Sequence, residues 1–341
     1  MTMRAALYRG VPRMEVEDLP VPSPSAGEVL VKVAGCGICH TDLHYLDHGV
    51  PTFKKPPLVL GHEISGTVES WGEEVSDWEE GDRVLLPAVT SCGTCSYCAS
   101  GRSNICARMK MFGNDVDGGY AEYVVAPARE IYPLPDSIPL IEGSVIADAV
   151  STPWHAVNNR AKIQKGEEVV VYGVGGVGIN VVQCAVAAGA RVTAVDIDAS
   201  KLEKAKELGA TETICAPQGE SAHKEVKRIT GGGAHCAIEA IGRADTIQSA
   251  FSSVRRGGRL VVLGYTHEKV PLPMGKLMYH EMSVVGTLGC GGGDYPEIIR
   301  AVAEGELALG PIVSGQIPLE KINEGFDLLR AGEGLRWVVI P

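Results

Sequence analysis

The segment of residues 35–44, GCGICHTDLH, carries several side chains that could take part in chemistry. These side chains are Cys39, Thr41, Asp42 and His44. A second segment, Gly61-His62-Glu63, follows closely in the sequence and adds an imidazole. The thiolate of Cys39 and the imidazole of His62 are two of the three protein ligands that a catalytic zinc ion requires. The first segment alone fits a buried structural cysteine beside a helix cap equally well, so the zinc interpretation depends on two further features.

The first of these features is a group of four cysteines with the spacing C-x2-C-x2-C-x7-C. Its members are Cys92, Cys95, Cys98 and Cys106. Such short spacing lets one loop place four thiolates around a single ion in a closed tetrahedral site. An iron–sulfur cluster is an alternative, but the ferredoxin pattern ends in Cys-Pro, whereas Ala107 follows Cys106. Disulfides are not expected because the chain opens without a secretory signal. We therefore predict a structural zinc site.

The second feature is a glycine-rich turn, GVGGVG, between an apolar strand expected at 168–172 and an apolar helix. The residues of this turn expected to bind a cofactor are Gly173, Gly175, Gly176, Val177 and Gly178. In this context the glycines let a pyrophosphate approach the backbone at a helix N-terminus. Asp196 ends the next expected strand, where its carboxylate can accept hydrogen bonds from the adenosine ribose. The pattern predicts an NAD site.

The elements that position these motifs change in character near residue 145. Before it, short apolar segments alternate with proline and glycine turns, which predicts antiparallel strands. After it, strands alternate with helices, which is typical of a doubly wound parallel sheet, and SKLE at 200–203 predicts a helix-capping box. The C-terminal segment is too short for a third domain and is expected to return to the first. The predicted fold is α/β, with domains at 1–145 and 146–285 and the returning segment at 286–341. Within that segment GCGGG at 289–293 is expected to be a flexible connection.

Composition excludes several classes of protein. The 341 residues carry a formal net charge of −11, which argues against a nucleic-acid-binding surface. Residues 169–190 are free of charge, but four glycines at 173–178 break the first half and Asn180 and Gln183 interrupt the second, so no membrane span is predicted. The N-terminus has no apolar core of signal-peptide length, and we expect a cytoplasmic protein.

Taken together, these motifs resemble the zinc-dependent alcohol dehydrogenases of the medium-chain dehydrogenase family. The resemblance is carried by GICHTD, GHE, the four-cysteine loop, GVGGVG and the terminal GLR at 334–336, in this order from about Met3 to the C-terminus. It implies a GroES-like catalytic domain, a Rossmann NAD-binding domain and two zinc ions per chain. We also expect a homo-oligomer, either a dimer or a tetramer.

The resemblance also implies roles for individual residues. Cys39 and His62 match the catalytic zinc ligands, and Asp148 falls where the family places its third ligand, with Glu142 the rival carboxylate nearby. Near the metal, Glu63 matches a neighbouring carboxylate, Asp42 matches the residue that orients the ligand imidazole, and Thr41 and His44 match a proton relay. At the cofactor, Asp196 and Lys201 match the residues that bind the ribose, and Arg336 matches the residue that neutralises the pyrophosphate.

These residues lead to one functional hypothesis and three alternatives. The hypothesis is the reversible NAD-dependent oxidation of a primary or secondary alcohol, with zinc as a Lewis acid and a proton relay through Thr41, a ribose hydroxyl and His44. One alternative is a polyol or sugar-alcohol dehydrogenase of the same family. A quinone-reductase-type relative would lack Cys39, His62 and the four-cysteine loop. The last alternative is a structural protein that binds zinc and nucleotide without catalysis.

Overall fold

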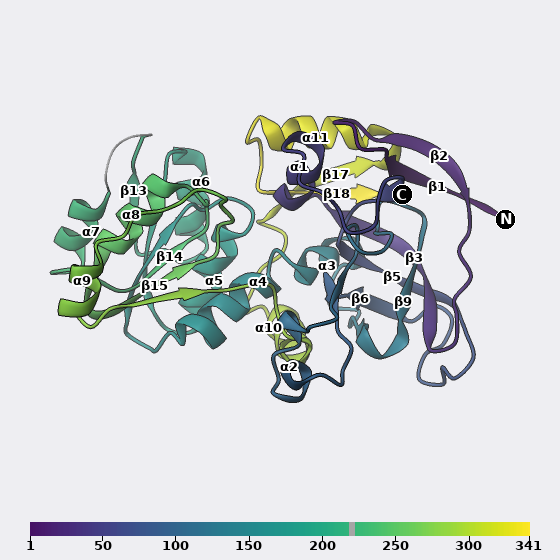
Figure 1. The fold of residues 1–341 in the computed structure, drawn as a ribbon, viewed down its shortest axis with the longest axis horizontal. Helices are drawn as coiled ribbons and strands as arrows, with labels where there is room; N and C mark the ends of the chain where they lie inside the picture. Colours follow the sequence, from purple (N-terminus) through teal and green to yellow (C-terminus); the bar gives the residue numbers. More distant parts are fainter. Residues whose placement is uncertain (218–221) are drawn as a thin grey trace. The chain divides into compact units, whose positions relative to one another are not determined.

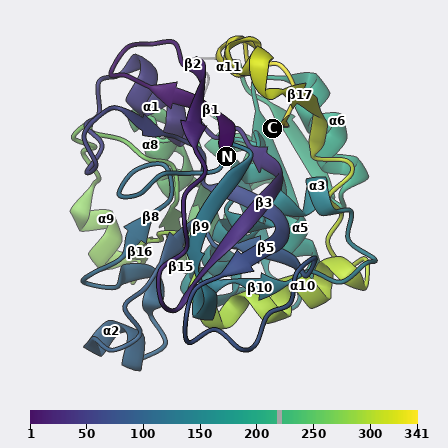
Figure 2. The ribbon, with the colours of Figure 1, turned by 90° about the vertical axis from the view of Figure 1, so that its right-hand side faces the viewer.

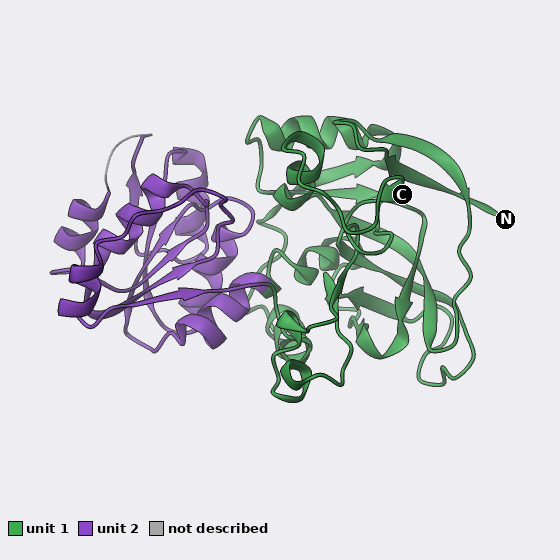
Figure 3. Ribbon diagram, viewed as in Figure 1, with its two compact units in different colours: residues 1–151, 289–341 green, residues 152–288 purple. Residues whose placement is uncertain are grey.

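The computed structural model describes residues 1–217 and 222–341, which form two compact units (Figure 3). Unit 1 comprises residues 1–151 and 289–341, and unit 2 comprises residues 152–288. The boundaries lie a few residues beyond the predicted positions at 145 and 285. The C-terminal segment packs with the N-terminal residues, so unit 1 is built from two separate stretches of chain.

The main sheet of unit 1 brings the two metal-binding segments together. Its strands are β3 (Glu28–Gly37), β5 (Glu63–Trp71), β6 (Arg83–Leu86), β9 (Tyr123–Pro127), β10 (Tyr132–Pro133), β17 (Val313–Pro318) and β18 (Arg336–Ile340). Their order is β10-β6-β5-β3-β18-β17, with β9 also paired to β3, and Figure 2 shows β3, β5 and β9 side by side. Because β3 and β5 are antiparallel, Gly37 at the end of β3 lies opposite Glu63 at the start of β5.

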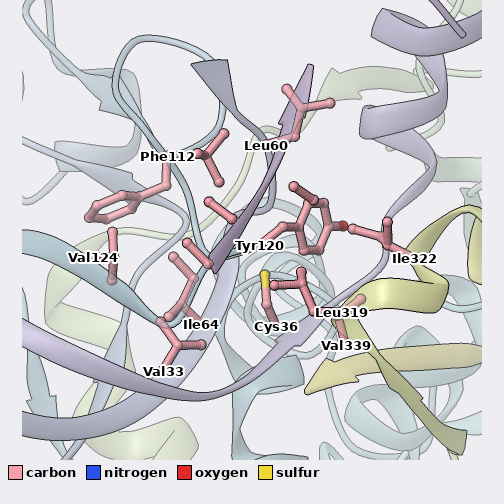
Figure 4. Close-up of a cluster of buried hydrophobic side chains, with 14 of the residues drawn as sticks. Val33, Cys36, Leu60, Ile64, Phe112, Tyr120, Val124, Leu319, Ile322 and Val339 are labelled. Carbon is pink, nitrogen blue, oxygen red and sulfur yellow. The ribbon is translucent and has the colours of Figure 1, made fainter. Parts of the chain in front are cut away.

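Smaller elements complete unit 1 (Figure 1). The remaining strands are β1 (Thr2–Tyr8), β2 (Glu15–Pro20), β4 (Leu58–Val59), β7 (Val89–Thr90) and β8 (Lys110–Met111). The α-helices are α1 (His40–Asp47), α2 (Ser96–Ala99), α3 (Leu140–Gly143), α10 (Tyr295–Ala303) and α11 (Ile322–Arg330). Apolar side chains from β3, β5, β9, β18 and α11 form one core, part of which is drawn in Figure 4. Both stretches of unit 1 contribute to this core, since Tyr120 packs edge-on against Phe326 with 6.0 Å between the ring centroids.

Unit 2 is a six-stranded parallel sheet with the order β13-β12-β11-β14-β15-β16. The strands are β11 (Glu168–Tyr172), β12 (Arg191–Asp196), β13 (Glu212–Cys215), β14 (Ala234–Glu239), β15 (Val254–Val262) and β16 (Ser283–Gly286). The helices include α4 (Ser151–Trp154, which begins at the unit boundary), α5 (Gly178–Ala187), α6 (Ala199–Glu207), α7 (His223–Ile229), α8 (Ala244–Ser253) and α9 (Met274–Tyr279). This strand order is that of a Rossmann fold, and it confirms the predicted doubly wound sheet. The order reverses between β11 and β14, where dinucleotides bind in such sheets.

One local prediction was wrong, and another segment makes closer contacts than expected. Helix α6 begins two residues earlier than the predicted capping box allows, because the carboxylate of Asp198 accepts from the backbone N–H of Ser200 at 2.8 Å. Asp198 therefore caps the helix in place of Ser200. The segment 289–293, whose flexibility stays a prediction, is packed at two positions: Cys290 is 4% exposed, and the N–H of Gly292 donates to the hydroxyl of Ser103 at 2.8 Å. Within the described residues, no helix combines the length and apolar character needed to cross a bilayer.

Candidate active site

The three predicted ligands of the catalytic zinc and one neighbouring carboxylate meet in unit 1. The ligand atoms of Cys39, His62, Glu63 and Asp148 all lie within 4.8 Å of one another. The Oδ2 atom of Asp148 is 3.7 Å from the Sγ of Cys39 and 3.7 Å from the Nε2 of His62. The rival carboxylate Glu142 is outside this group. Chain segments separated by about a hundred residues are thus brought together around one point.

The donor atoms in this cluster fit a metal ion. A tetrahedral zinc with ordinary bond lengths holds sulfur and oxygen ligands about 3.5 Å apart and nitrogen and oxygen ligands about 3.3 Å apart. The observed separations are within a few tenths of an ångström of these values. Both ring nitrogens of His62 are buried and have no hydrogen-bond partner among the residues that the structure describes. A buried polar atom without a hydrogen-bond partner destabilises a fold. Coordination of a metal ion by Nε2 would give this atom the partner that the protein contacts do not supply.

Asp42 lies behind His62, as the resemblance implied. Its side chain is completely buried, and its Oδ1 is 3.7 Å from the Nδ1 of His62. Its Oδ2 accepts from the hydroxyl of Tyr120 at 2.8 Å and from the backbone N–H of Cys39 at 3.3 Å. A carboxylate that faces Nδ1 favours the tautomer in which Nε2 is available to a metal. Tyr120 therefore holds the carboxylate that faces His62, and no pattern in the sequence indicated this contact.

Glu63 and Arg336 form a buried pair next to the cluster. The Nη2 of Arg336 is 3.5 Å from Oε1 of Glu63, and its Nη1 donates to the carbonyl of Ile38 at 2.8 Å. Burial raises the pKa of the Glu63 carboxyl to about 7, although the charge of Arg336 acts in the opposite direction. The guanidinium of Arg336 is only 2% exposed in unit 1. Its structural contacts are thus with Glu63 and the β3–α1 turn, and its implied role at the pyrophosphate stays a prediction.

The two residues of the implied proton relay both lie on α1. The hydroxyl of Thr41 is 3.6 Å from the Sγ of Cys39, which places it beside the metal cluster. His44 is three residues further along the helix and is half-buried. Its ring lies 5.5 Å from that of the exposed His48, measured between centroids. Thr41 and His44 are therefore about one helical turn apart on α1, and their role as a proton relay stays a prediction.

The four cysteines of the loop at 92–106 surround a single point. Their sulfur atoms are separated by 3.4 Å (Cys106–Cys92), 3.5 Å (Cys95–Cys98), 3.8 Å (Cys95–Cys106) and 4.0 Å (Cys92–Cys98). A zinc ion bound tetrahedrally to four thiolates holds them about 3.8 Å apart. All ten cysteines of the chain are free, so the disulfide alternative does not hold. Backbone N–H donors and Arg108 lower the pKa of Cys92 to about 5, which favours the thiolate needed for binding.

We predict that the two metal sites differ in lability. The four-cysteine site has no open coordination position, whereas the cluster at Cys39 leaves one for substrate, so its zinc should exchange faster. Brief dialysis against a chelator is expected to reduce the zinc content from two ions per chain to one and to abolish activity. Elemental analysis before and after dialysis measures this. Full activity with one zinc ion or none would contradict the two-site assignment.

The glycine turn in unit 2 has the openings that a dinucleotide requires. Gly173 has a φ of +84°, and a Cβ at Gly178 would lie 1.8 Å from the carbonyl oxygen of Gly173, so neither position admits a side chain. A Cβ at Gly175 would meet nothing within 4 Å, which leaves the backbone open to a bound phosphate. The side chain of Asn180 donates to the carbonyl of Gly176 at 3.0 Å and fixes the turn against α5.

Asp196 is at the predicted end of β12 and organises the same turn. Its Oδ2 accepts from the N–H of Val174 at 2.8 Å, and its Oδ1 accepts from the N–H of Asp198 at 3.0 Å. Lys201, the other implied ribose residue, has its Nζ 4.0 Å from the carboxylate of Asp198. The residues present therefore fit a dinucleotide, with Asp196 serving both the loop and the expected ribose position.

Comparison with known proteins identifies the family. Residues 25–136 match the family model described as "Alcohol dehydrogenase GroES-like domain", and residues 176–304 match "Zinc-binding dehydrogenase". An alcohol dehydrogenase from Geobacillus stearothermophilus is 37% identical over 333 residues, which cover 97% of each chain. The sorbitol dehydrogenase of Bacillus subtilis is 33% identical and covers 99% of this chain and 97% of its own.

Solved structures agree with this assignment. An NAD-dependent alcohol dehydrogenase has a TM-score of 0.92 at 32% identity, covering 99% of this chain and 100% of that one. A zinc-binding dehydrogenase from Sinorhizobium meliloti 1021, bound to NADP, has a TM-score of 0.90 at 31% identity and is matched over 100% of both chains. The chain belongs to the zinc-dependent alcohol dehydrogenases of the medium-chain dehydrogenase family. It is an oxidoreductase that acts on alcohols, and the GroES-like fold expected for unit 1 is confirmed.

Proposed function

We propose that this enzyme oxidises a primary or secondary alcohol with NAD, and that Cys39, His62 and Asp148 hold its catalytic zinc. The observation that carries the proposal is the buried cluster itself. A thiolate, an imidazole and a carboxylate converge within bonding range of one ion, and a hydroxyl lies next to them. Two anionic ligands formally balance the charge of Zn²⁺, and three protein ligands leave one position for an alcohol oxygen.

The chemistry is divided between the bound groups and the chain. Zinc supplies a Lewis acid that lowers the pKa of the alcohol hydroxyl, and NAD supplies the hydride acceptor. The hydroxyl of Thr41, which lies beside Cys39, would take the alcohol proton while it gives its own to a ribose hydroxyl of the cofactor. His44 would then take the ribose proton and release it toward solvent. Asp42 and Tyr120 keep the imidazole of His62 in its binding orientation. The glycine turn and Asp196 hold the cofactor by its pyrophosphate and adenosine ribose.

A panel of alcohols tests the proposal and separates its alternatives. Primary alcohols, secondary alcohols and vicinal diols are assayed with NAD by the absorbance of NADH. We expect turnover of simple alcohols that requires the chelatable zinc. A consistent rate preference for vicinal diols would favour the polyol alternative, for which the similarity to sorbitol dehydrogenase is the supporting observation. Absence of turnover with every substrate, despite bound zinc and NAD, would favour the structural protein.

We predict a preference for NAD over NADP. The carboxylate of Asp196 would face the 2′-phosphate, and two like charges about 4 Å apart repel by about 4 kcal/mol at an effective dielectric of about 20. The nearby cations Arg191 and Lys201 could offset this repulsion, but Arg191 is 2.9 Å from the carboxylate of Glu168 and Lys201 approaches Asp198.

The measurement is kcat/KM with each cofactor. We expect NAD to be favoured by about a hundredfold, which is about 2.7 kcal/mol, because partial exposure weakens the repulsion. Asp196→Ala should reduce the preference and also lower the efficiency with NAD, because Val174 then loses its acceptor. Equal efficiency of the two cofactors with the unmodified enzyme would show that Asp196 does not face the 2′ position.

We also propose that the enzyme is a homo-oligomer that associates through unit 2. β16 is the terminal strand of the sheet within the described residues, and Val284 on it is exposed. The neighbouring α9 exposes Met274, Met278 and Tyr279. A second copy can cover both the strand edge and these apolar side chains. Light scattering should give a multiple of the chain mass, and Val284→Lys should lower it. A monomeric native enzyme would contradict the proposal.

A further inference from the structure

The direction of the Asp148 side chain depends on the peptide that precedes it. Asp148 follows the 3-10 helix η3 (Ser144–Ala147), and its φ of −139° and ψ of −52° are neither helical nor extended. The regular hydrogen bonds of a helix therefore do not fix this residue. Contacts to the carbonyl of Ala147 bear directly on its direction, because that carbonyl belongs to the peptide that joins Ala147 to Asp148.

Two buried hydroxyl groups donate to this carbonyl. The Oη of Tyr295 lies 2.7 Å from the carbonyl oxygen of Ala147, and the Oγ of Ser151 lies 2.9 Å from it. Ala147, Ser151 and Tyr295 are each 1% exposed. Tyr295 belongs to the C-terminal stretch of unit 1 and begins α10, so it reaches the peptide from a distant part of the sequence. The two donors satisfy both lone pairs of the oxygen and leave the peptide little freedom to rotate.

Tyr295 is in turn connected to the four-cysteine loop. Its ring stacks on that of Tyr132, with 4.9 Å between centroids and an interplanar angle of 23°. The hydroxyl of Tyr132 donates to the carbonyl of Gly292 at 2.8 Å, and the N–H of Gly292 donates to the Oγ of Ser103 at 2.8 Å. The carbonyl of Ser103 accepts from the N–H of the zinc ligand Cys106 at 3.0 Å.

Gly292 is the tightest point in this series of contacts. A Cβ at this position would lie 2.7 Å from the Oη of Tyr132, closer than real Cβ contacts. The glycine thus lets the segment 291–294 lie directly on the loop and under the ring that stacks on Tyr295. This close packing explains the glycine at position 292, whereas a Cβ at Gly289 or Gly293 would meet nothing within 4 Å.

We propose that Tyr295 is a positioning residue for the zinc ligand Asp148, and that Gly292 couples this position to the four-cysteine loop. Order in the four-cysteine loop then sets the affinity of the catalytic zinc. The inference rests on the proposed ligand role of Asp148. It assigns the segment 291–295 a function in metal binding, although the cluster itself consists of Cys39, His62, Glu63 and Asp148.

The first test is Tyr295→Phe, which keeps the stacked ring and removes only the hydroxyl. Ala147 retains the hydrogen bond from Ser151, so the variant should fold. Loss of an interaction that orients a ligand typically weakens metal binding by about 10- to 100-fold, and we expect at least about tenfold here. The affinity of the catalytic zinc is measured by competition with a chelator, and the Co²⁺-substituted site is followed by its thiolate absorption band. Zinc in the four-cysteine site should be retained.

Tyr172→Phe provides a matched control. Tyr172 is a buried tyrosine of unit 2 whose hydroxyl is 2.6 Å from the Oγ of Ser253, so its loss should cost similar stability. Tyr172→Phe should leave the affinity for the catalytic zinc unchanged. Equal zinc affinities for the native enzyme and Tyr295→Phe would overturn the positioning role. Asp148→Asn is titrated in parallel: if it loses the zinc while Tyr295→Phe keeps it, only this inference fails, and if it keeps the zinc, the ligand assignment itself fails.

Gly292→Ala tests the coupling, because it substitutes no metal ligand and neither tyrosine but places a Cβ against the Oη of Tyr132. We expect it to weaken the catalytic zinc and to shift the Co²⁺ band in the same way as Tyr295→Phe. In the double variant the zinc affinity should fall by less than the product of the two single effects, because both substitutions act through one contact. Multiplicative effects, or an effect of Tyr295→Phe without one of Gly292→Ala, would overturn the coupling to the loop.

Discussion

Asp148→Asn is expected to remove the catalytic zinc and to lower kcat/KM for alcohol oxidation by about a thousandfold or more. A Lewis acid contributes several kcal/mol to such a reaction, and each 1.36 kcal/mol is a factor of ten in rate. The neutral amide also leaves Cys39 as the only anionic ligand. Zinc in the four-cysteine loop and binding of NAD should persist, which metal analysis and a cofactor titration would show.

Glu63→Gln is the matched comparison, since Glu63 is the other carboxylate in the cluster. Arg336 lies 3.5 Å from Glu63, whereas Asp148 faces both Cys39 and His62. We therefore expect Glu63→Gln to retain most of its zinc and to destabilise the fold, because it leaves the buried charge of Arg336 without its anion. Zinc loss from Glu63→Gln, together with native turnover of Asp148→Asn, would reverse the assignment of the two carboxylates.

Cys95→Ser is expected to produce the largest loss of stability. A serine hydroxyl is a poor zinc ligand, so the ion in the four-cysteine loop should be lost. When the concentration of free zinc is about a thousandfold above its dissociation constant, zinc binding adds about 4.1 kcal/mol to the free energy of unfolding. For a unit of this size that corresponds to a fall of about 8–16 °C in Tm. Calorimetry of the variant and of the native enzyme measures the shift.

Cys215→Ser is the control for this substitution. Cys215 is an exposed cysteine of unit 2 that lies outside both metal clusters. The same change of sulfur to oxygen should leave Tm within about 1 °C there. If Cys95→Ser unfolds at the native temperature with its full zinc content, the loop does not bind zinc through four thiolates.

Local sequence spacing was sufficient to predict some of these features. Cys92 and Cys106 are held in one loop by short connections, and the loop brings their sulfurs to 3.4 Å. The glycine turn between β11 and α5 is likewise a contiguous pattern whose geometry its residue types dictate. Asp148 is different, because it meets Cys39 across 109 residues. Its prediction came from family resemblance, since nothing in its own segment distinguishes it from a capping residue.

Other contacts could not be predicted because they arise from packing. Tyr120 and Asp42 are 78 residues apart, and Tyr295 and Ala147 are 148 residues apart. In the sequence each tyrosine is indistinguishable from an ordinary core aromatic residue. The cap of α6 was misassigned for a local reason. Asp198 and Ser200 can both cap a helix, and the extended backbone of Asp198 decides between them.

The two-part construction of unit 1 has a consequence for the order in which the nascent chain folds. β18 lies between β3 and β17, and its Val338 and Val339 pair with Gly37 and Cys36. Unit 2 is continuous and leaves the ribosome before β18 is translated, so it is expected to complete its fold first. Until β18 is translated, the edge of β3 near Cys39 stays unpaired, and Arg336 is not yet available to contact Glu63. Maturation of the catalytic metal site is therefore expected to be among the last events of biosynthesis, after translation of residues 336–340.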